Sequence, residues 1–170
     1  MIACPVCSSE NIEGMDQCEE CGQSLNDTHL SPPTNKVERS LLRDRISALA
    51  PTQPITVRPS TPVGDVLRLM VERKIGCVVV ADGSTPVGIF SERDALRKLN
   101  TEAPELAGHP VSEFMTPNPQ TLVANAKIAF AVQRMDMGGY RHLPIVGEQA
   151  ELVGIISARD ILRHLTDNLA

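Results

Sequence analysis

Aromatic residues are almost absent from this sequence of 170 residues, which contains three phenylalanines, one tyrosine and no tryptophan. Hydrophobic residues still make up 42% of the chain, so we expect a core of aliphatic side chains. No apolar run approaches the roughly 18 residues that a membrane span requires, and the N-terminal MIACPVC lacks the basic and apolar segments of a signal peptide. These absences predict a soluble cytoplasmic protein, and the length favours one domain with at most a small appendage.

Positive charge is missing from the first 35 residues, which contain no Lys or Arg. The same segment carries six acidic side chains: Glu10, Glu13, Asp16, Glu19, Glu20 and Asp27. An acidic segment repels the phosphate backbone of nucleic acids, and the whole chain has a net charge of −5. We therefore do not expect nucleic-acid binding, and a structural or protein-docking role suits this segment better.

Cysteines are concentrated in the same N-terminal segment. Four of the five form a C-x2-C-x10-C-x2-C array: Cys4, Cys7, Cys18 and Cys21. Two such pairs commonly build a tetrahedral zinc site, and Gly22 supplies the permissive backbone of its turn. Disulfides suit a secreted chain, and iron remains the alternative metal. Residues 1–25 resemble a small zinc ribbon that folds on metal binding, whereas Cys77 is predicted to be a buried small hydrophobe.

A linker and an entry helix are predicted over residues 26–45. Residues 26–35, NDTHLSPPTN, are polar and contain prolines, which is typical of a linker. The following KVERSLLRDRISAL has apolar residues at helical spacing, and the region of Pro51 and Pro54 ends this helix.

The rest of the chain is an internal repeat. The segment GIFSERDALRKL at 88–99 recurs without a gap as GIISARDILRHL at 154–165, with eight of twelve positions identical. Each copy predicts an extended entry, a helix, two strands joined by a polar turn, and a final helix. A copy of roughly 55 residues buries too little surface alone. We therefore expect an α+β fold in which two β-α-β-β-α repeats, 46–105 and 106–170, pack with pseudo-twofold symmetry around two equivalent clefts.

The repeated Gly-Ile-x-Ser-x-Arg-Asp motif has two interpretations. As a binding motif, its helix N-terminus, serine and arginine would contact phosphate, its aspartate would accept from ribose hydroxyls, and its isoleucine would pack on a base. These residues are Ile89, Ser91, Arg93 and Asp94 in one copy and Ile155, Ser157, Arg159 and Asp160 in the other. As a local motif, Ser-x-x-Asp is a helix capping box that requires no ligand.

Several motifs resemble those of a known family. GIFSERD and GIISARD fit the G-x-x-[ST]-x-x-[DN] motif of CBS domains, and YRHLPIV and VSEFMTPNPQTLV fit the same family. Residues 46–168 thus resemble a tandem CBS pair, or Bateman module, which implies clefts for adenosine ligands such as AMP, ADP, ATP or S-adenosylmethionine. By resemblance, one cleft would use Ser157, Arg159 and Asp160 with Ile55 and Gly76. The other would use Ser91, Arg93 and Asp94 with Thr121 and His142.

The first copy departs from the second at one segment, where Gly76-Cys77-Val78 replaces His142-Leu143-Pro144. Its cleft is therefore expected to be less polar. His142 itself suits either a structural hydrogen bond or a phosphate contact, and both interpretations stay open. His109 and His164 are predicted to lie on the surface.

The function implied is that of a non-catalytic regulatory module that binds adenine nucleotide and signals to a partner protein in trans. The resemblance also implies a homodimer, with structural Zn²⁺ in the ribbon. The alternative is a ligand-free adaptor that docks through the ribbon. An enzyme is not expected, since the sequence has no Gly-rich phosphate loop and no convincing Ser-His-Asp or Cys-His arrangement.

Overall fold

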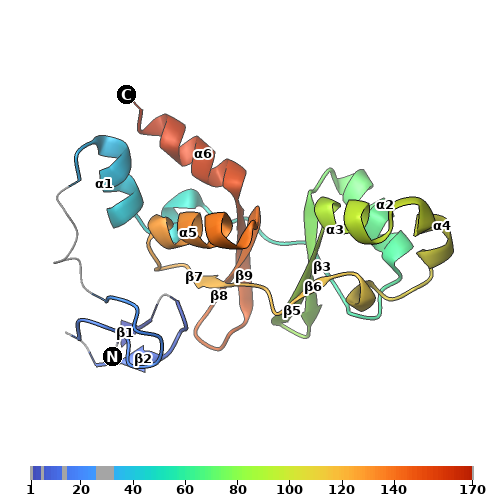
Figure 1. Cartoon of the computed structure of the whole chain (residues 1–170), viewed down its shortest axis with the longest axis horizontal. Coiled ribbons are helices and arrows are strands. Elements are labelled where there is room, and N and C mark those ends of the chain that lie inside the picture. Colours follow the sequence, from blue (N-terminus) through green and yellow to red (C-terminus); the bar gives the residue numbers. More distant parts are fainter. Residues whose placement is uncertain (1, 5, 13–14, 26–32, 170) are drawn as a thin grey trace. The chain divides into compact units, whose positions relative to one another are not determined.

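A computed structural model describes residues 2–4, 6–12, 15–25 and 33–169 (Figure 1). The chain forms two compact units. Unit 1 comprises Met1–Pro51, Leu122–Leu143 and Ile156–Ala170, and unit 2 comprises Thr52–Thr121 and Pro144–Ile155. Most of the expected linker, residues 26–32, lies outside the described residues. Within the described residues, no helix combines the length and the apolar character needed to cross a membrane.

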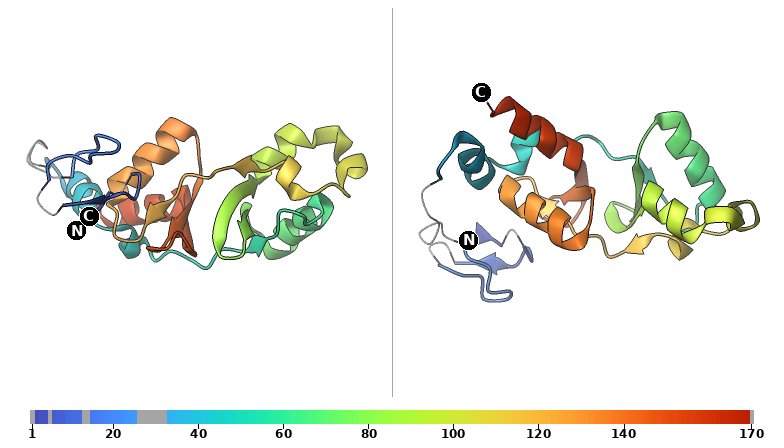
Figure 2. Two further views of the ribbon diagram at one scale, coloured as in Figure 1. Left: turned by 90° about the horizontal axis from the view of Figure 1, so that it is seen from below. Right: turned by 45° about the horizontal axis from the view of Figure 1, so that its top comes forward.

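The first repeat has the expected β-α-β-β-α order. Its elements are β3 (Thr56–Val57), α2 (Val63–Arg73), β4 (Cys77–Asp82), β5 (Thr85–Ser91) and α3 (Glu92–Lys98). The sheet has the order β3-β4-β5-β6, where β6 is Thr116–Pro117. β3 runs parallel to β4 and the other pairs are antiparallel. The helices α2, α3 and α4 (Ala103–Leu106) lie on one face of this sheet (Figure 2).

The core of this repeat is largely aliphatic, as predicted. Its buried residues are Val63, Val66, Met70, Val78, Val80, Phe90, Leu99, Val111 and Phe114, which include two of the three phenylalanines. β4 is buried on both faces, which explains its unbroken apolar sequence. Its hairpin to β5 turns at Gly83, whose φ of +61° lies in the left-handed region. The pairing of Cys77 with Ser91 then places the end of β5 beside the start of β4.

The second repeat has the same order. Its elements are β7 (Leu122–Val123), α5 (Ile128–Gly138), β8 (His142–Val146), β9 (Leu152–Ser157) and α6 (Ala158–Asp167). They include a sheet of order β7-β8-β9. α5 ends at Gly139, which adopts a left-handed conformation that stops the helix. The α+β class and the two β-α-β-β-α repeats are thus confirmed.

The entry helix is shorter than the sequence predicted. α1 spans Lys36–Arg43 and begins at Asn35, whose side chain accepts the Glu38 N–H. The backbone extends at Asp44, and a separate 3₁₀ turn, η1, covers Ile46–Leu49. The expected continuous helix over residues 36–49 was therefore wrong. Long-range backbone bonds explain the break, since Ile46 N–H donates to Ala126 O at 2.8 Å and Ile128 N–H donates to Asp44 O at 3.0 Å.

His164 is also not the surface residue that was predicted. Its side chain on α6 is only 15% exposed. Its Nε2 lies 2.5 Å from Ser40 Oγ on α1 and 3.2 Å from Asp44 Oδ2, while the buried Ser40 hydroxyl donates to Asp44 Oδ2 at 2.6 Å. These contacts join α1 to α6. His109, in contrast, is exposed as predicted, and its ring contacts the Glu113 carboxylate and the Phe114 ring.

Candidate functional site: two Ser-Asp motifs and a four-cysteine cluster

The first motif forms a complete capping box at the junction of β5 and α3. Ser91 is the N-cap of α3, and its Oγ accepts the Asp94 N–H at 3.3 Å. In return, Asp94 Oδ2 accepts the Ser91 N–H at 3.0 Å and the Ser91 hydroxyl at 2.6 Å. The local interpretation of this motif is therefore confirmed, since the two side chains satisfy the helix start without a ligand.

The second oxygen of Asp94 also has partners inside the protein. Oδ1 accepts the Thr116 hydroxyl at 3.1 Å and lies 3.2 Å from Lys98 Nζ. Burial raises the pKa of Asp94, but hydrogen bonds from Ser91 and the nearby Lys98 ammonium outweigh burial, so the pKa is lower than usual. The sequence analysis did not identify Thr116 or Lys98. Only the i,i+4 spacing of Asp94 and Lys98 signalled a pair.

The second motif repeats the capping box at the junction of β9 and α6. Ser157 is the N-cap, and Asp160 Oδ2 accepts its N–H at 2.8 Å and its hydroxyl at 2.7 Å. Asp160 Oδ1 lies 3.4 Å from Arg163 Nη1, and the Arg163 side chain is 65% exposed. The same sequence motif thus has different surroundings in the two copies.

The arginines and isoleucines of the two motifs differ in their exposure. Arg93 and Arg159 are exposed, while Ile89 and Ile155 are half-buried on β5 and β9. The Gly76 carbonyl accepts the Glu92 N–H at 3.0 Å, next to the first motif.

Each predicted cleft draws residues from both units. Ser157, Arg159 and Asp160 belong to unit 1, whereas Ile55 and Gly76 belong to unit 2. Ser91, Arg93, Asp94 and Thr121 belong to unit 2, whereas His142 belongs to unit 1. The structure assembles each Ser-Arg-Asp set locally, and the joining of each set to residues of the other unit stays a prediction.

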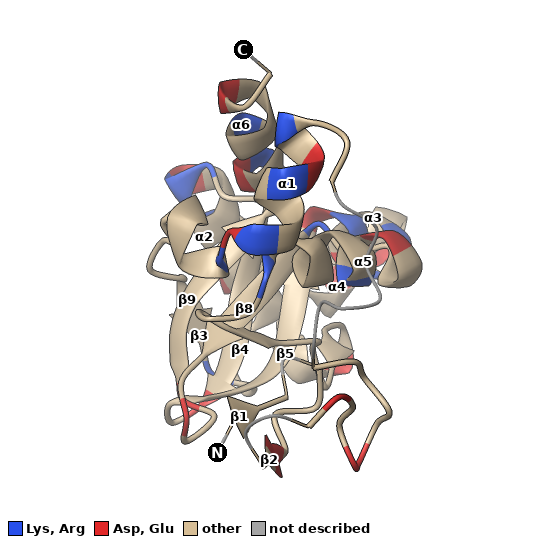
Figure 3. Cartoon of the chain, turned by 90° about the vertical axis from the view of Figure 1, so that its left-hand side faces the viewer, with Lys and Arg blue, Asp and Glu red and all other residues tan. Residues whose placement is uncertain are grey.

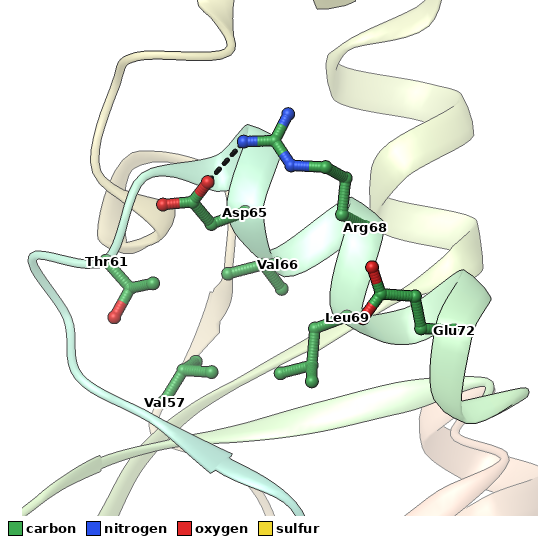
Figure 4. Close-up of a pocket in the computed structure, with 7 residues that line it drawn as sticks. All are labelled: Val57, Thr61, Asp65, Val66, Arg68, Leu69 and Glu72. Carbon is green, nitrogen blue, oxygen red and sulfur yellow. Dashed lines mark hydrogen bonds and ion pairs between the residues drawn. The ribbon is translucent and has the colours of Figure 1, made fainter.

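A groove of about 350 Å³ lies beside α2 in unit 2 (Figure 4). Asp65 and Arg68 form an ion pair at its rim, and Val57, Val66 and Leu69 line its apolar side. Its lining includes no residue of the two motifs. The groove therefore adds nothing to the predicted nucleotide sites.

The four N-terminal cysteines come together as their spacing predicted. Their Sγ atoms all lie within 4.8 Å of one another, with Cys4–Cys21 at 3.6 Å and Cys7–Cys18 at 3.5 Å. Four thiolates around one zinc ion, each about 2.3 Å from it, require sulfur separations of about 3.8 Å. The arrangement therefore fits a tetrahedral metal ion.

The two cysteine turns have the same backbone design. Cys4 O accepts the Ser8 N–H at 2.9 Å, and Cys18 O accepts the Gly22 N–H at 2.9 Å. Ser8 and Gly22 both have positive φ, at +63° and +70°. The role predicted for Gly22 is confirmed, and Ser8 takes the equivalent position in the first turn.

The thiols influence one another strongly. A hydrogen bond from the Ser9 hydroxyl lowers the pKa of Cys18 to about 5. The Gln23 N–H lowers the pKa of Cys21, but burial and the neighbouring thiols outweigh it and raise that pKa to about 12. Adjacent thiols resist a second negative charge, which a bound divalent cation would neutralise.

Arg134 on α5 connects the cysteine turns to the second repeat. Its guanidinium donates a hydrogen bond to the Val6 carbonyl, between the first two cysteines. Burial lowers the pKa of Arg134, while the thiols of Cys4, Cys21 and Cys7 act in the opposite direction. In Figure 3, the described part of this N-terminal region carries acidic (red) and no basic (blue) positions. The positive charge beside the cysteine turns therefore comes from Arg134 on α5.

Two curated proteins resemble this chain over most of its length. An uncharacterized 17.7 kDa protein in the bps2 3' region of Acidianus ambivalens is 31% identical over 124 residues, covering 72% of this chain and 74% of that protein. The CBS domain-containing protein CBSCBSPB2 of Arabidopsis thaliana is 29% identical over 167 residues, covering 98% of this chain. That match spans only 30% of the Arabidopsis protein.

A solved structure and a family match agree with these relatives. The CBS domain protein PAE2072 from Pyrobaculum aerophilum, complexed with AMP, is 26% identical with a TM-score of 0.62, covering 72% of this chain and 98% of that one. Two segments of the chain, 46–101 and 111–167, each match the CBS domain. The chain therefore belongs to the CBS domain family, of which it carries a tandem pair.

Proposed function

We propose that this protein is a non-catalytic regulatory module that binds an adenine nucleotide and signals to a partner protein in trans. The observation that carries the proposal is the Ser-Asp pair at a strand-to-helix junction, which recurs in both CBS repeats. The complex of PAE2072 with AMP supports this ligand class. Backbone amides at a helix start suit phosphate, and a carboxylate suits ribose hydroxyls.

The signal would arise from binding across the two repeats. A ligand that contacts both repeats favours the arrangement that it fits best, and a partner that recognises this arrangement binds more tightly as a result. For this function we divide the chain into a ribbon (1–25), a linker and entry helix (26–45), and repeats at 46–105 and 106–170.

Calorimetric titration of the metal-loaded chain with AMP, ADP, ATP and S-adenosylmethionine tests the ligand class, with GMP as the control for the base. Saturable heat with at least one adenosine ligand and a weaker response to GMP is the expected result. No heat and no thermal shift with any of the four ligands would contradict the proposal. That result would favour the ligand-free adaptor, which the complete capping boxes also permit.

The four-cysteine cluster is proposed to hold a structural Zn²⁺. Its fit to tetrahedral sulfur geometry supports this, as does the small core of the segment. Among the described residues up to 25, only Cys4, Asn11 and Cys18 are buried, so metal binding would supply much of the folding free energy. Elemental analysis should find one zinc per chain, and Cys18→Ser should lower that content. Iron instead of zinc would show visible charge-transfer absorbance.

A homodimer is proposed from apolar side chains that both repeats expose at equivalent positions. Val71 of the first repeat aligns with Met137 of the second, and the two are 78% and 80% exposed. Leu96 aligns in the same way with Leu162, and these are 75% and 62% exposed. Exposed apolar helix positions that recur in both repeats suit burial against a second copy of the chain.

Sedimentation analysis tests this dimer. The double variant Leu96→Glu/Leu162→Glu should be monomeric at concentrations where the native chain is a dimer. Leu169→Glu is the matched control, because Leu169 is 75% exposed and has no apolar partner of this kind in the other repeat. A monomeric native chain, or equal effects of all these substitutions, would contradict the proposed interface.

A further inference from the structure

Each capping box leaves one carboxylate oxygen for other partners. Oδ2 of Asp94 accepts from Ser91, and Oδ2 of Asp160 accepts from Ser157 in the same way. A ribose presents two neighbouring hydroxyls that need acceptors, so Oδ1 becomes the critical atom in each motif. The two copies differ at this atom.

In the first copy, Oδ1 is held from two sides. Thr116 donates its hydroxyl to Asp94 Oδ1 at 3.1 Å, and Lys98 Nζ lies 3.2 Å away. Lys98 is itself fixed, because Nζ also donates to Phe114 O at 2.8 Å and to Met115 O at 2.9 Å. The Asp94 side chain is 12% exposed, compared with 19% for Asp160.

The strand β6 places Thr116 beside the first motif. Thr116 pairs with Ile89, and Pro117 pairs with Gly88, along the edge of β5. A Cβ atom at Gly88 would lie 2.2 Å from Met115 Sδ, so the motif glycine serves here to admit a methionine side chain. Residues 115 and 116, which lie in unit 2 beyond the first copy, thus pack against its motif.

The second copy has no lysine equivalent to Lys98. By strand pairing, the counterpart of Thr116 is Thr52, because Thr52 pairs with Ile155 as Thr116 pairs with Ile89. The alignment of the two repeats places His164 at the position of Lys98. The His164 side chain is occupied elsewhere, because its Nε2 contacts Ser40 on α1. The ammonium group that contacts Asp94 Oδ1 is therefore not repeated in the second copy. The described side-chain partners of Asp160 within unit 1 are Ser157 and Arg163.

The contact that Asp160 Oδ1 does make is weak. Its distance to Arg163 Nη1 is long, at 3.4 Å, and the Arg163 side chain is 65% exposed. Such an exposed pair contributes little and is readily exchanged for a ligand.

We propose that the chain binds one nucleotide, with the ribose on Asp160, and that Thr116 and Lys98 close the first motif by occupying Asp94 Oδ1. A ribose at Asp94 would have to displace the Thr116 hydrogen bond and the Lys98 ion pair, whereas a ribose at Asp160 displaces one exposed contact. The inference rests on the proposed nucleotide binding and identifies which of the two motifs performs it.

Calorimetric titration of the full, metal-loaded chain with AMP tests the inference. The native chain should bind one AMP per chain. Asp160→Asn removes the negative charge but keeps the side-chain shape, and it should weaken binding by about tenfold or more. The matched variant Asp94→Asn should bind within about threefold of the native chain.

A second variant keeps the test decisive if Asp94→Asn fails to fold. Thr116→Val preserves the shape of Thr116 and the charge of Asp94, and it should retain the Asp160-dependent binding of AMP. Two AMP molecules per native chain, or a loss of about tenfold with Asp94→Asn while Asp160→Asn binds normally, would overturn the choice of motif and leave the proposed function intact. Failure of the native chain to bind AMP or any other adenosine ligand would refute the proposed function itself.

Discussion

At the scale of single residues, the repeated serines and aspartates are primarily helix caps, and their remaining contacts distinguish the copies. Asp94 lies in a network with Ser91, Lys98 and Thr116, whereas Asp160 has only Ser157 and an exposed Arg163 as described partners. The capping role follows from local sequence. The network around Asp94 depends on a residue 22 positions later in the chain.

Asp94 should make the stability of the first repeat depend on acidic pH. Its folded pKa is lower than usual, so its ionised form stabilises the fold above its unfolded pKa of about 3.9. This stabilisation is lost as pH falls through the folded pKa. Asp94→Asn should lower the free energy of unfolding at pH 7 by roughly 1.5–3 kcal/mol, and urea titrations should show a smaller difference from the native chain at pH 3. An equal difference at both pH values would contradict this role.

At the scale of elements, α1 contacts α6 through the side chain of His164. The buried Ser40 hydrogen-bonds to both Asp44 and His164. This cluster lies at the C-terminal end of α1, where the backbone becomes extended at Asp44. The periodicity of residues 36–49 predicted one continuous helix. Local spacing carries no information about the long-range hydrogen bond from the Ile46 N–H to the Ala126 carbonyl, which competes with the helical hydrogen bonds. Tertiary contacts therefore decided where α1 ends.

Removal of the His164 side chain should weaken the attachment of α1. His164→Ala leaves the buried Ser40 with fewer hydrogen bonds, and we expect a loss of about 1–2 kcal/mol in the free energy of unfolding. His109→Ala is the matched control, since His109 forms an exposed i,i+4 contact with Glu113 that contributes below about 1 kcal/mol. Urea denaturation followed by circular dichroism measures both variants. Equal decreases in the free energy of unfolding for the two variants would show that the α1–α6 contact stabilises the fold no more than an exposed surface contact does.

At the scale of the whole molecule, the chain combines an N-terminal segment whose described residues bury no aliphatic side chain with two repeats that have the folded order of a CBS pair. The repeats bury aliphatic side chains in their sheets, and the N-terminal segment buries thiols. Removal of the proposed zinc ion should therefore unfold the N-terminal segment and leave the repeats folded.

Thiol titration distinguishes unfolding of the N-terminal segment from unfolding of the repeats. With a chelator present at pH 8, four of the five cysteines should react with a disulfide reagent, and Cys77 should react only after denaturation. Burial, with help from Glu92 and Asp94, raises the pKa of Cys77 to about 12, so the buried thiol stays protonated and inaccessible. Rapid reaction of all five thiols in the chelated protein would show that the loss of metal also unfolds the repeats.

The sequence by itself determined the features that depend on spacing and composition. The recurrence of one motif predicted two β-α-β-β-α repeats, the cysteine pairs predicted a cluster, and Ser-x-x-Asp predicted helix caps. These features depend on periodicity and on contacts between near neighbours in the chain, which a single sequence displays directly. Contacts distant in sequence were decided by the tertiary structure alone. β6 brings Thr116 to Asp94, and α1 receives His164, because strand pairing and helix packing choose partners that local sequence does not specify.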